Sequence, residues 1–402
     1  MTIISGLFPN SGKKQQNRNI DYREKIRAHK LSVFIRTLVV VVAVVGLIVV
    51  LNLIWKDKAY SGYTVVSSAP LSVVTGAKAL NLDGNVLVYS KDGVGCFGAN
   101  GKAIWNESYE MQSPIVSICG ETVAIGDYNG REIYVANKSK VLGTVKTNLP
   151  IRSLTVSDTG MVMAVLDDVD VIRMYGYDGN KDTDEPMITA KASMNKSGYP
   201  ISVALSPNGK LMMVSYFHVD GGSMRSSVSF YNFGEVGENN ADNFVSGFDY
   251  DNSVLPYSRF MDDRNSFGIS NDRLVFFQGA EIPNNSATAI LSEKVIGIYN
   301  SKDYVGLVYL DSTGESTYRL DIYSNKGDKV GSTKFDIEYT DIIFDDDRVI
   351  IYGGSDCIIR TVKGTDKFVG TLGSGVNLLI PTSSSEKFLV LTGEELELVE
   401  LN

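Results

Sequence analysis

The residues in this sequence that come nearest to a chemical site are acidic side chains in short clusters. The segment Asp178–Asp184 places oxygen-bearing side chains at alternate positions, as calcium-binding loops do. An EF-type loop also needs glycine at its sixth position and glutamate at its twelfth, where this segment has Thr183 and Thr189. We interpret the segment as a solvated turn, with a looser surface calcium site as the alternative.

Two other acidic clusters, Asp262–Asp263 and Asp345–Asp347, could supply the paired carboxylates that cleave glycosidic bonds. Such a pair must lie about 5 to 10 Å apart, and spacing along the chain does not determine that distance. Each cluster follows an expected strand, where aspartate is favoured because its side chain bonds to nearby backbone amides. We therefore interpret both clusters as turns.

The chain has few histidines and cysteines, which limits the metal sites, triads and disulfides that it can form. The two histidines are His29 and His218, too few for a histidine-based metal site, and no nucleophile motif accompanies His218 for a Ser-His-Asp triad. Three separate cysteines, Cys96, Cys119 and Cys357, cannot form a full set of disulfides, so we expect buried free thiols. So few cysteines outside the cytoplasm would favour a bacterial envelope protein.

Glycine-rich and tyrosine-rich segments also have structural explanations. Gly353–Gly354 and Gly373–Gly375 connect strands, with no helix to present its amino end to a phosphate. The 21 tyrosines mostly alternate along strands, which is typical of sheet packing. The sequence thus predicts no catalytic residue, no cofactor-binding residue, no metal ligand and no cofactor, and we expect a protein that is not an enzyme.

A membrane anchor is the clearest feature of the N-terminal part. Thr37–Trp55 carries no charge, and a helix of about 20 residues spans the hydrocarbon core of a bilayer. Eight lysines and arginines precede it, which predicts a cytoplasmic tail over residues 1–36. A cleaved signal peptide is the alternative, although Lys56–Tyr60 makes a poor cleavage site.

The chain beyond this helix is expected to lie outside the cytoplasm, after a linker over residues 56–62. It carries a net charge of about −15, and it has no basic stripe, which excludes nucleic acid as a partner. The expected partners are the lipid bilayer, through residues 37–55, and a protein or the cell wall.

Residues 63–402 show short apolar runs that alternate with a period of two and are separated by turn pairs such as Asp83-Gly84 and Asn129-Gly130. The strongest runs recur at intervals of mostly 37 to 50 residues, the period of four-stranded propeller blades. The fold class predicted is all-β, a β-propeller of eight blades. Seven remain open, because the unit over residues 255–292 is weakly patterned.

The eight units begin near residues 78, 115, 152, 199, 255, 294, 339 and 376. The last has room for only three strands, whereas Tyr63–Leu71 offers one extra strand ahead of the first unit. We expect this N-terminal strand to complete the final blade, since a ring must cover its open edges. The unit from residue 199 is too long, and Asn232–Asn243 is its expected excess loop.

Three short motifs resemble known propeller repeats. Asp92-Gly93 through Gly98–Trp105 resembles the repeat of quinoprotein-dehydrogenase-like propellers, whereas Ser157–Gly160 and Ser206–Leu211 resemble the inner turn of WD-type repeats. The whole chain resembles an uncharacterised bacterial family of single-pass, membrane-anchored propellers with no assigned function. Trp105 is the one tryptophan beyond the helix end, so the ring of docking tryptophans that quinoprotein repeats carry is absent.

The function expected from these features is a non-catalytic protein-binding or cell-envelope scaffold module. Propellers supply a stiff ring with many loops, and no group of residues here is suited to a reaction. One alternative is a cell-wall glycan-binding module. The other, implied by the quinoprotein resemblance, is a quinone-cofactor dehydrogenase with clustered Asp, Asn and Arg at the central channel.

Overall fold

The computed structural model describes residues 22–56, 58–71, 73–193, 198–220, 222–373 and 375–402. The chain forms two compact units, Met1–Lys58 and Ala59–Asn402. The first unit contains one long helix and the second contains all of the strands.

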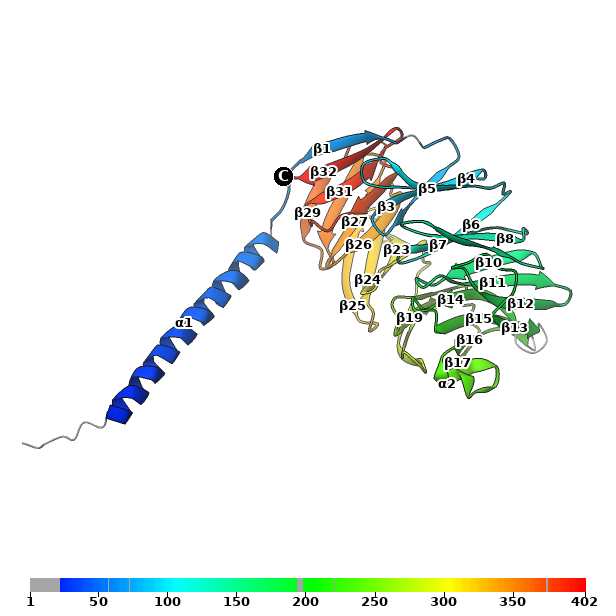
Figure 1. Cartoon of the computed structure of the whole chain (residues 1–402), viewed down its shortest axis with the longest axis horizontal. Helices are drawn as coiled ribbons and strands as arrows, with labels where there is room; N and C mark the ends of the chain where they lie inside the picture. Colours follow the sequence, from blue (N-terminus) through cyan, green and yellow to red (C-terminus); the bar gives the residue numbers. More distant parts are fainter. Residues whose placement is uncertain (1–21, 57, 72, 194–197, 221, 374) are drawn as a thin grey trace, which may run out of the picture. The chain divides into compact units, whose positions relative to one another are not determined.

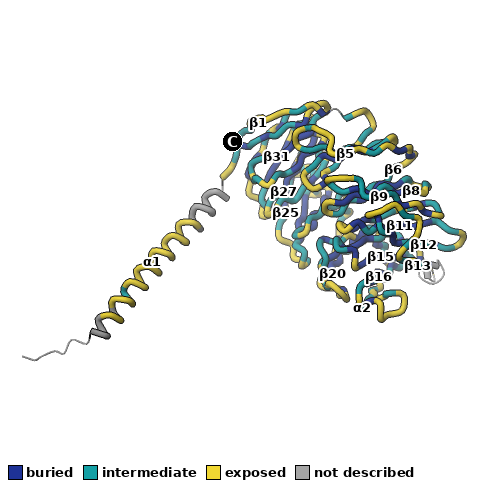
Figure 2. The backbone as a smooth tube through the Cα atoms, in the orientation of Figure 1, coloured by how far each residue is buried: buried dark blue, intermediate teal, exposed yellow. Residues whose placement is uncertain are grey.

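Helix α1 (Tyr22–Lys56) is long and apolar enough to cross a membrane. Its segment His29–Ile48 has a mean hydropathy of 2.7 and buries no side chains within the protein (Figure 2). The Thr37 hydroxyl donates to the Val33 carbonyl at 2.9 Å, so this polar group is satisfied inside the apolar helix. A signal sequence near the N-terminus can have the same length and hydropathy as a membrane span.

The second unit is a β-propeller of eight four-stranded antiparallel blades, as the sequence predicted (Figure 1). The first strands of most neighbouring blades lie side by side, so they form the inner part of the ring. Blade one contains β2 (Lys78–Leu82), β3 (Asn85–Tyr89), β4 (Gly93–Phe97) and β5 (Ala103–Ser108), and blade two contains β6 (Pro114–Cys119), β7 (Thr122–Asp127), β8 (Glu132–Asn137) and β9 (Val141–Lys146). Blade three contains β10 (Ile151–Val156), β11 (Met161–Asp168), β12 (Val171–Asp178) and β13 (Ile188–Ser193), blade four contains β14 (Tyr199–Leu205), β15 (Leu211–Asp220), β16 (Ser223–Asn232) and β17 (Phe244–Asp251), and blade five contains β18 (Tyr257–Phe260), β19 (Asn265–Ile269), β20 (Arg273–Gln278) and β21 (Asn284–Ile290). Blade six contains β22 (Gly297–Asn300), β23 (Tyr304–Leu310), β24 (Tyr318–Ser324) and β25 (Lys329–Phe335), and blade seven contains β26 (Asp341–Asp345), β27 (Arg348–Gly353), β28 (Asp356–Thr361) and β29 (Asp366–Thr371).

The eighth blade joins the two ends of the propeller chain. It contains β30 (Leu378–Pro381), β31 (Lys387–Leu391) and β32 (Glu395–Leu401), and β1 (Tyr63–Pro70) pairs with β32 as its fourth strand. Figure 1 shows blue β1 alongside red β32. The Tyr63 hydroxyl also accepts the N–H of Gly373 at 2.9 Å, which ties β1 to the segment that leaves blade seven.

Two neighbouring blades share each apolar core. In blade three, Val162 and Ala164 of β11 pack toward blade two, whereas Met163 and Val165 pack toward blade four. This follows from the period of two along a strand, which directs successive side chains to opposite faces of the sheet. Trp105 adds a polar link from blade one to blade two, because its Nε1 donates to the Asn137 carbonyl at 2.8 Å.

Tight turns join the strands within a blade where the sequence predicted them. Asp83 and Gly84 connect β2 to β3 with φ angles of 46° and 87°. Positive φ at both central residues is typical of the turn that fits a two-residue hairpin, and glycine adopts it without strain. The turn pairs in the sequence therefore set the length of the hairpins.

Blade five confirms the predicted count of eight, whereas blade four differs from its prediction in one segment. The weakly patterned unit over residues 255–292 forms a complete blade of four strands, so the count is eight. Within Asn232–Asn243, where a loop was expected, the chain forms α2 (Glu235–Glu238) and η1 (Ala241–Asn243). Blade four is also long because β15 and β16 have ten residues each.

The antiparallel order gives the propeller two distinct faces. We name the connection face as the one that carries the links between blades and the turns from each second strand to the third. The turn face carries the turns from first to second strands and from third to fourth strands. Side chains on these two faces belong to different blades, and the ring brings them together.

Candidate functional site

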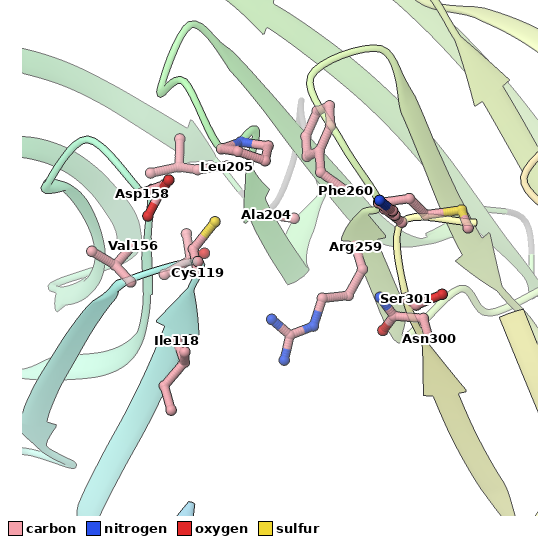
Figure 3. A pocket seen from close by; sticks show the side chains of 15 residues that line it. Ile118, Cys119, Val156, Asp158, Ala204, Leu205, Arg259, Phe260, Asn300 and Ser301 are labelled. Carbon is pink, nitrogen blue, oxygen red and sulfur yellow. The ribbon is translucent and has the colours of Figure 1, made fainter. Parts of the chain in front are cut away.

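A cavity of about 440 Å³ lies where the inner strands of five consecutive blades end, at the turn face (Figure 3). Its walls come from the ends of β6, β10, β14, β18 and β22 and the turns that follow them. The lining residues are Ile118, Cys119, Gly120, Thr155, Val156, Asp158, Ala204, Leu205, Pro207, Arg259, Phe260, Met261, Asn300, Ser301 and Lys302.

Asp158 is the carboxylate in this lining, and it is used in holding turns together. Its Oδ1 accepts the N–H of Glu121 at 2.7 Å, and its own N–H donates to the Pro207 carbonyl at 2.9 Å. These bonds join blades two, three and four. Burial raises the pKa of the nearby Cys119 thiol to about 11, so this thiol stays neutral at physiological pH.

The cluster Asp262–Asp263 forms a turn, in agreement with its interpretation from sequence. Oδ1 of Asp262 accepts the N–H groups of Arg264 and Asn265, both at 2.7 Å. Oδ1 of Asp263 accepts the N–H of Asn208 at 2.8 Å and thereby links blade five to blade four. Both carboxylates act as backbone caps.

The cluster Asp345–Asp347 occupies the turn between β26 and β27. Asp345 pairs with Arg348, and Asp346 adopts a φ of 50°. This turn belongs to blade seven, and blade six separates it from the Asp262–Asp263 turn of blade five. The two clusters therefore belong to separate turns.

Two carboxylates of the acidic segment Asp178–Asp184 accept backbone amides. Oδ1 of Asp178 accepts the backbone N–H of Asn180 at 3.1 Å, and Oδ1 of Asp182 accepts the N–H of Thr144 at 2.9 Å. Within the described part of the chain, no group of three or more His, Cys, Asp or Glu side chains is placed to hold a metal ion.

The two histidines lie in unrelated places. His29 is exposed on α1, whereas His218 is on β15 opposite Arg225. The His218 ring packs against Gly198, where a Cβ atom would lie 2.8 Å from the ring. Its Nε2 is buried and has no hydrogen-bond partner among the described residues.

The three cysteines are free thiols, as the sequence predicted. Cys96 and Cys357 are buried, whereas Cys119 is half-buried in the wall of the cavity. Burial raises the pKa of Cys96 to about 11 and that of Cys357 to about 12. These thiols are therefore poor nucleophiles near neutral pH.

The cavity residues do not fit the metal-held quinone implied by the quinoprotein resemblance. Such a site needs several acidic or amide oxygens directed at one metal ion. Asp158 is the lining carboxylate, and its Oδ1 already accepts the Glu121 amide. The cavity lining is therefore not suited to a metal-held quinone.

The connection face is the second candidate site, because several blades present exposed apolar side chains on it. Val169, in the turn from β11 to β12, is 83% exposed, and Ile290, at the end of β21, is 73% exposed. Further exposed apolar residues lie at strand ends and links on the same face: Val74, Val219, Met224, Ile296 and Leu310.

An apolar cavity opens on this face between blades five and six. Its volume is about 740 Å³. Its apolar lining includes Val254, Tyr257, Leu291, Ile296 and Ile298. It lies next to the exposed Ile296, so the cavity and the exposed side chains form one apolar region at this point of the connection face.

These features define the class of protein: a closed eight-bladed β-propeller preceded by one apolar helix. More particularly, the chain belongs to a family of unknown function (DUF5711), whose model matches residues 56–401. A search of functionally curated proteins finds no significant match.

Solved structures share the propeller fold at low sequence identity. The structure of apo AztD from Citrobacter koseri is 10% identical, with a TM-score of 0.50, and the match covers 74% of this chain and 86% of that one. BamB from Moraxella catarrhalis is 12% identical, with a TM-score of 0.49 and coverage of 84% and 100%. At these identities the likeness concerns the fold alone.

Neither candidate region was identified from the sequence. Arg259 and Lys302 in the cavity come from different blades, and no motif surrounds them. Val169 and Val219 lie just beyond the strong apolar runs Val162–Val165 and Leu211–Val214. One signal was available: both valines adjoin aspartates at a hairpin end, where a buried strand residue is not expected.

Proposed function

We propose that this protein is a non-catalytic protein-binding module anchored in a cell membrane. Residues 1–36 form its cytoplasmic tail, residues 37–55 its membrane span and residues 56–62 its linker, and the propeller over residues 63–402 lies outside the cytoplasm. The observation that carries this proposal is the set of exposed apolar side chains on the connection face. Exposed apolar patches on a folded domain mark interaction sites.

The chemistry of these side chains indicates the partner. Val169 is followed by Asp170 in the same turn, whereas Asp168 on its other side already pairs with Arg173. An apolar side chain beside a carboxylate such as Asp170 favours a partner segment that presents apolar residues together with lysine or arginine. The domain's net charge of about −15 would attract such a segment over a distance.

A binding role also accounts for how the polar groups are used. The carboxylates at the turns of blades three and five accept backbone amides instead of facing a substrate. A catalytic acid or base must instead reach the proton that it transfers. A glycan-binding surface would be expected to show exposed aromatic rings, whereas the most exposed side chains of the connection face are aliphatic.

Membrane anchoring is supported by α1 and the basic tail that precedes it. The segment His29–Ile48 has the length and hydropathy of a span. The excess of lysine and arginine before the apolar run supports a cytoplasmic location for the tail. The propeller then faces the other side of the membrane, where its connection face is available to envelope proteins.

Site-specific photocrosslinking in cells tests the proposal. A photoreactive amino acid replaces Val169 or Val219 on the connection face, and Met187 or Ile282 on the turn face serves as a control at a similarly exposed apolar position. We expect connection-face sites to crosslink one protein, through a peptide that carries apolar and basic residues. Val169→Asp should abolish that product, whereas Met187→Asp should not.

Two outcomes would contradict the proposal. Equal crosslinking from both faces would remove the assignment of the connection face. Products that contain glycan and no protein would replace the protein-binding proposal with the cell-wall alternative.

A further inference from the structure

Two positive side chains in the central cavity have no carboxylate partner among the described residues. Arg259, at the end of β18, donates from Nε to the Tyr257 hydroxyl at 3.3 Å, which leaves its two terminal nitrogens free of protein partners there. Lys302 follows β22, and its ammonium group forms no ion pair or hydrogen bond with the described part of the chain. Figure 3 shows the Arg259 guanidinium directed into the cavity.

This arrangement differs from that of most other arginines in the propeller. Seven of them pair with a carboxylate: Arg152, Arg173, Arg225, Arg273, Arg319, Arg348 and Arg360. In a domain this acidic, a cation without a partner in a concave site is suited to a ligand of opposite charge. Arginine in particular presents a planar fork that matches the two oxygens of a carboxylate or phosphate.

Neutral hydrogen-bond donors lie on the same side of the cavity as Arg259. Oγ of Ser301 accepts the N–H groups of Asp303 at 3.3 Å and Tyr304 at 3.2 Å, so its own O–H can donate to a ligand. The Asn300 side chain lies beside it (Figure 3) and forms no side-chain hydrogen bond with the described residues. These groups can complete the coordination of an oxyanion.

One wall of the cavity is apolar, and the lining carboxylate is already bonded. Ile118, Val156 and Leu205 form the wall opposite Asn300 (Figure 3). Asp158 is directed at the neighbouring turn, because a Cβ atom at Gly120 would lie only 2.3 Å from its Oδ1. The carboxylate is thus held against the protein backbone, on the other side of the cavity from Asn300 and Ser301.

We propose that the central cavity binds a small molecule with a carboxylate or phosphate group and an apolar body. Arg259 and Lys302 bind the oxyanion, and the wall formed by Ile118, Val156 and Leu205 contacts the apolar body. The volume of about 440 Å³ falls in the range typical of small-ligand pockets, about 300 to 1,000 Å³. This site is on the turn face, so it is independent of the protein-binding proposal for the connection face.

The test uses probes that share one apolar body and differ in charge: benzoate, phenyl phosphate and neutral benzamide. Binding to the full-length protein in lipid nanodiscs is measured by calorimetry and by saturation-transfer NMR. We expect benzoate or phenyl phosphate to bind, and benzamide to bind at least about tenfold more weakly. Preference between the two anions distinguishes a carboxylate ligand from a phosphate ligand.

Matched variants locate the site. Arg259→Gln should weaken anion binding at least about tenfold, and Lys302→Gln should weaken it several-fold. Arg264→Gln removes the same charge from the same blade outside the cavity lining and should leave binding unchanged. The proposal is overturned if neither anion binds, or if Arg264→Gln weakens binding as much as Arg259→Gln in proteins with equal melting temperatures.

Discussion

At the residue scale, the polar side chains of the propeller divide into those that serve the fold and those that do not. Asp158, Asp262 and Asp263 accept backbone N–H groups at turns, which satisfies donors that would otherwise be unpaired. Arg259 and Lys302 have no comparable structural role within the described residues. These two cations are therefore available to a ligand, although no sequence motif surrounds them.

The native thiols should react slowly with maleimide. Burial raises the pKa of Cys119 to about 11, so at about pH 8 only about one thiol in a thousand is the reactive thiolate. Labelling should accelerate as pH rises toward that pKa. We expect each native thiol to label at least about tenfold more slowly than Ser139→Cys, on an exposed turn. Equal rates would contradict the burial of these cysteines.

Because the native thiols should label slowly, an introduced cysteine can report the membrane topology. A membrane-impermeant maleimide applied to intact cells should label Ser139→Cys in the propeller. It should label Ser11→Cys in the tail only after lysis. The reverse pattern, or a mature protein that lacks the tail, would contradict the proposed anchor and its orientation.

At the scale of elements, short-range signals predicted the strands well. The turn pair Asp83-Gly84 and the period of two fixed where hairpins form, because both depend on a few adjacent residues. The prediction was less accurate over Asn232–Asn243, where α2 is only four residues long. A helix that short has too few residues to show a helical period.

Strand β1 should contribute strongly to stability. Its deletion (residues 63–70) would expose the edge of β32 and remove the Tyr63 contact with Gly373, so several kcal/mol of stabilisation should be lost. We expect the melting temperature of the full-length protein to fall by at least about 5 °C. Differential scanning calorimetry measures this change directly.

The control for that deletion removes residues 2–12, which lie outside the described part of the chain. This second truncation should leave the melting temperature unchanged. If both truncations had the same midpoint as the full-length protein, β1 would not lock the ring.

At the scale of the whole molecule, ring closure creates sites that no local pattern contains. The cavity combines residues from five blades, and Ile118 and Lys302 are far apart in the sequence. The repeat spacing predicted how many blades there are. It could not predict which side chains converge, because that depends on how neighbouring blades pack and on where each inner strand ends.

Binding of a protein to the connection face can be measured by hydrogen–deuterium exchange. The full-length protein in nanodiscs is compared with and without the partner identified by crosslinking. We predict slower exchange in the β11–β12 and β15–β16 hairpins and in the link over residues 291–296 when the partner is bound. Protection confined to the turn face or to the outer strands would contradict binding at the connection face.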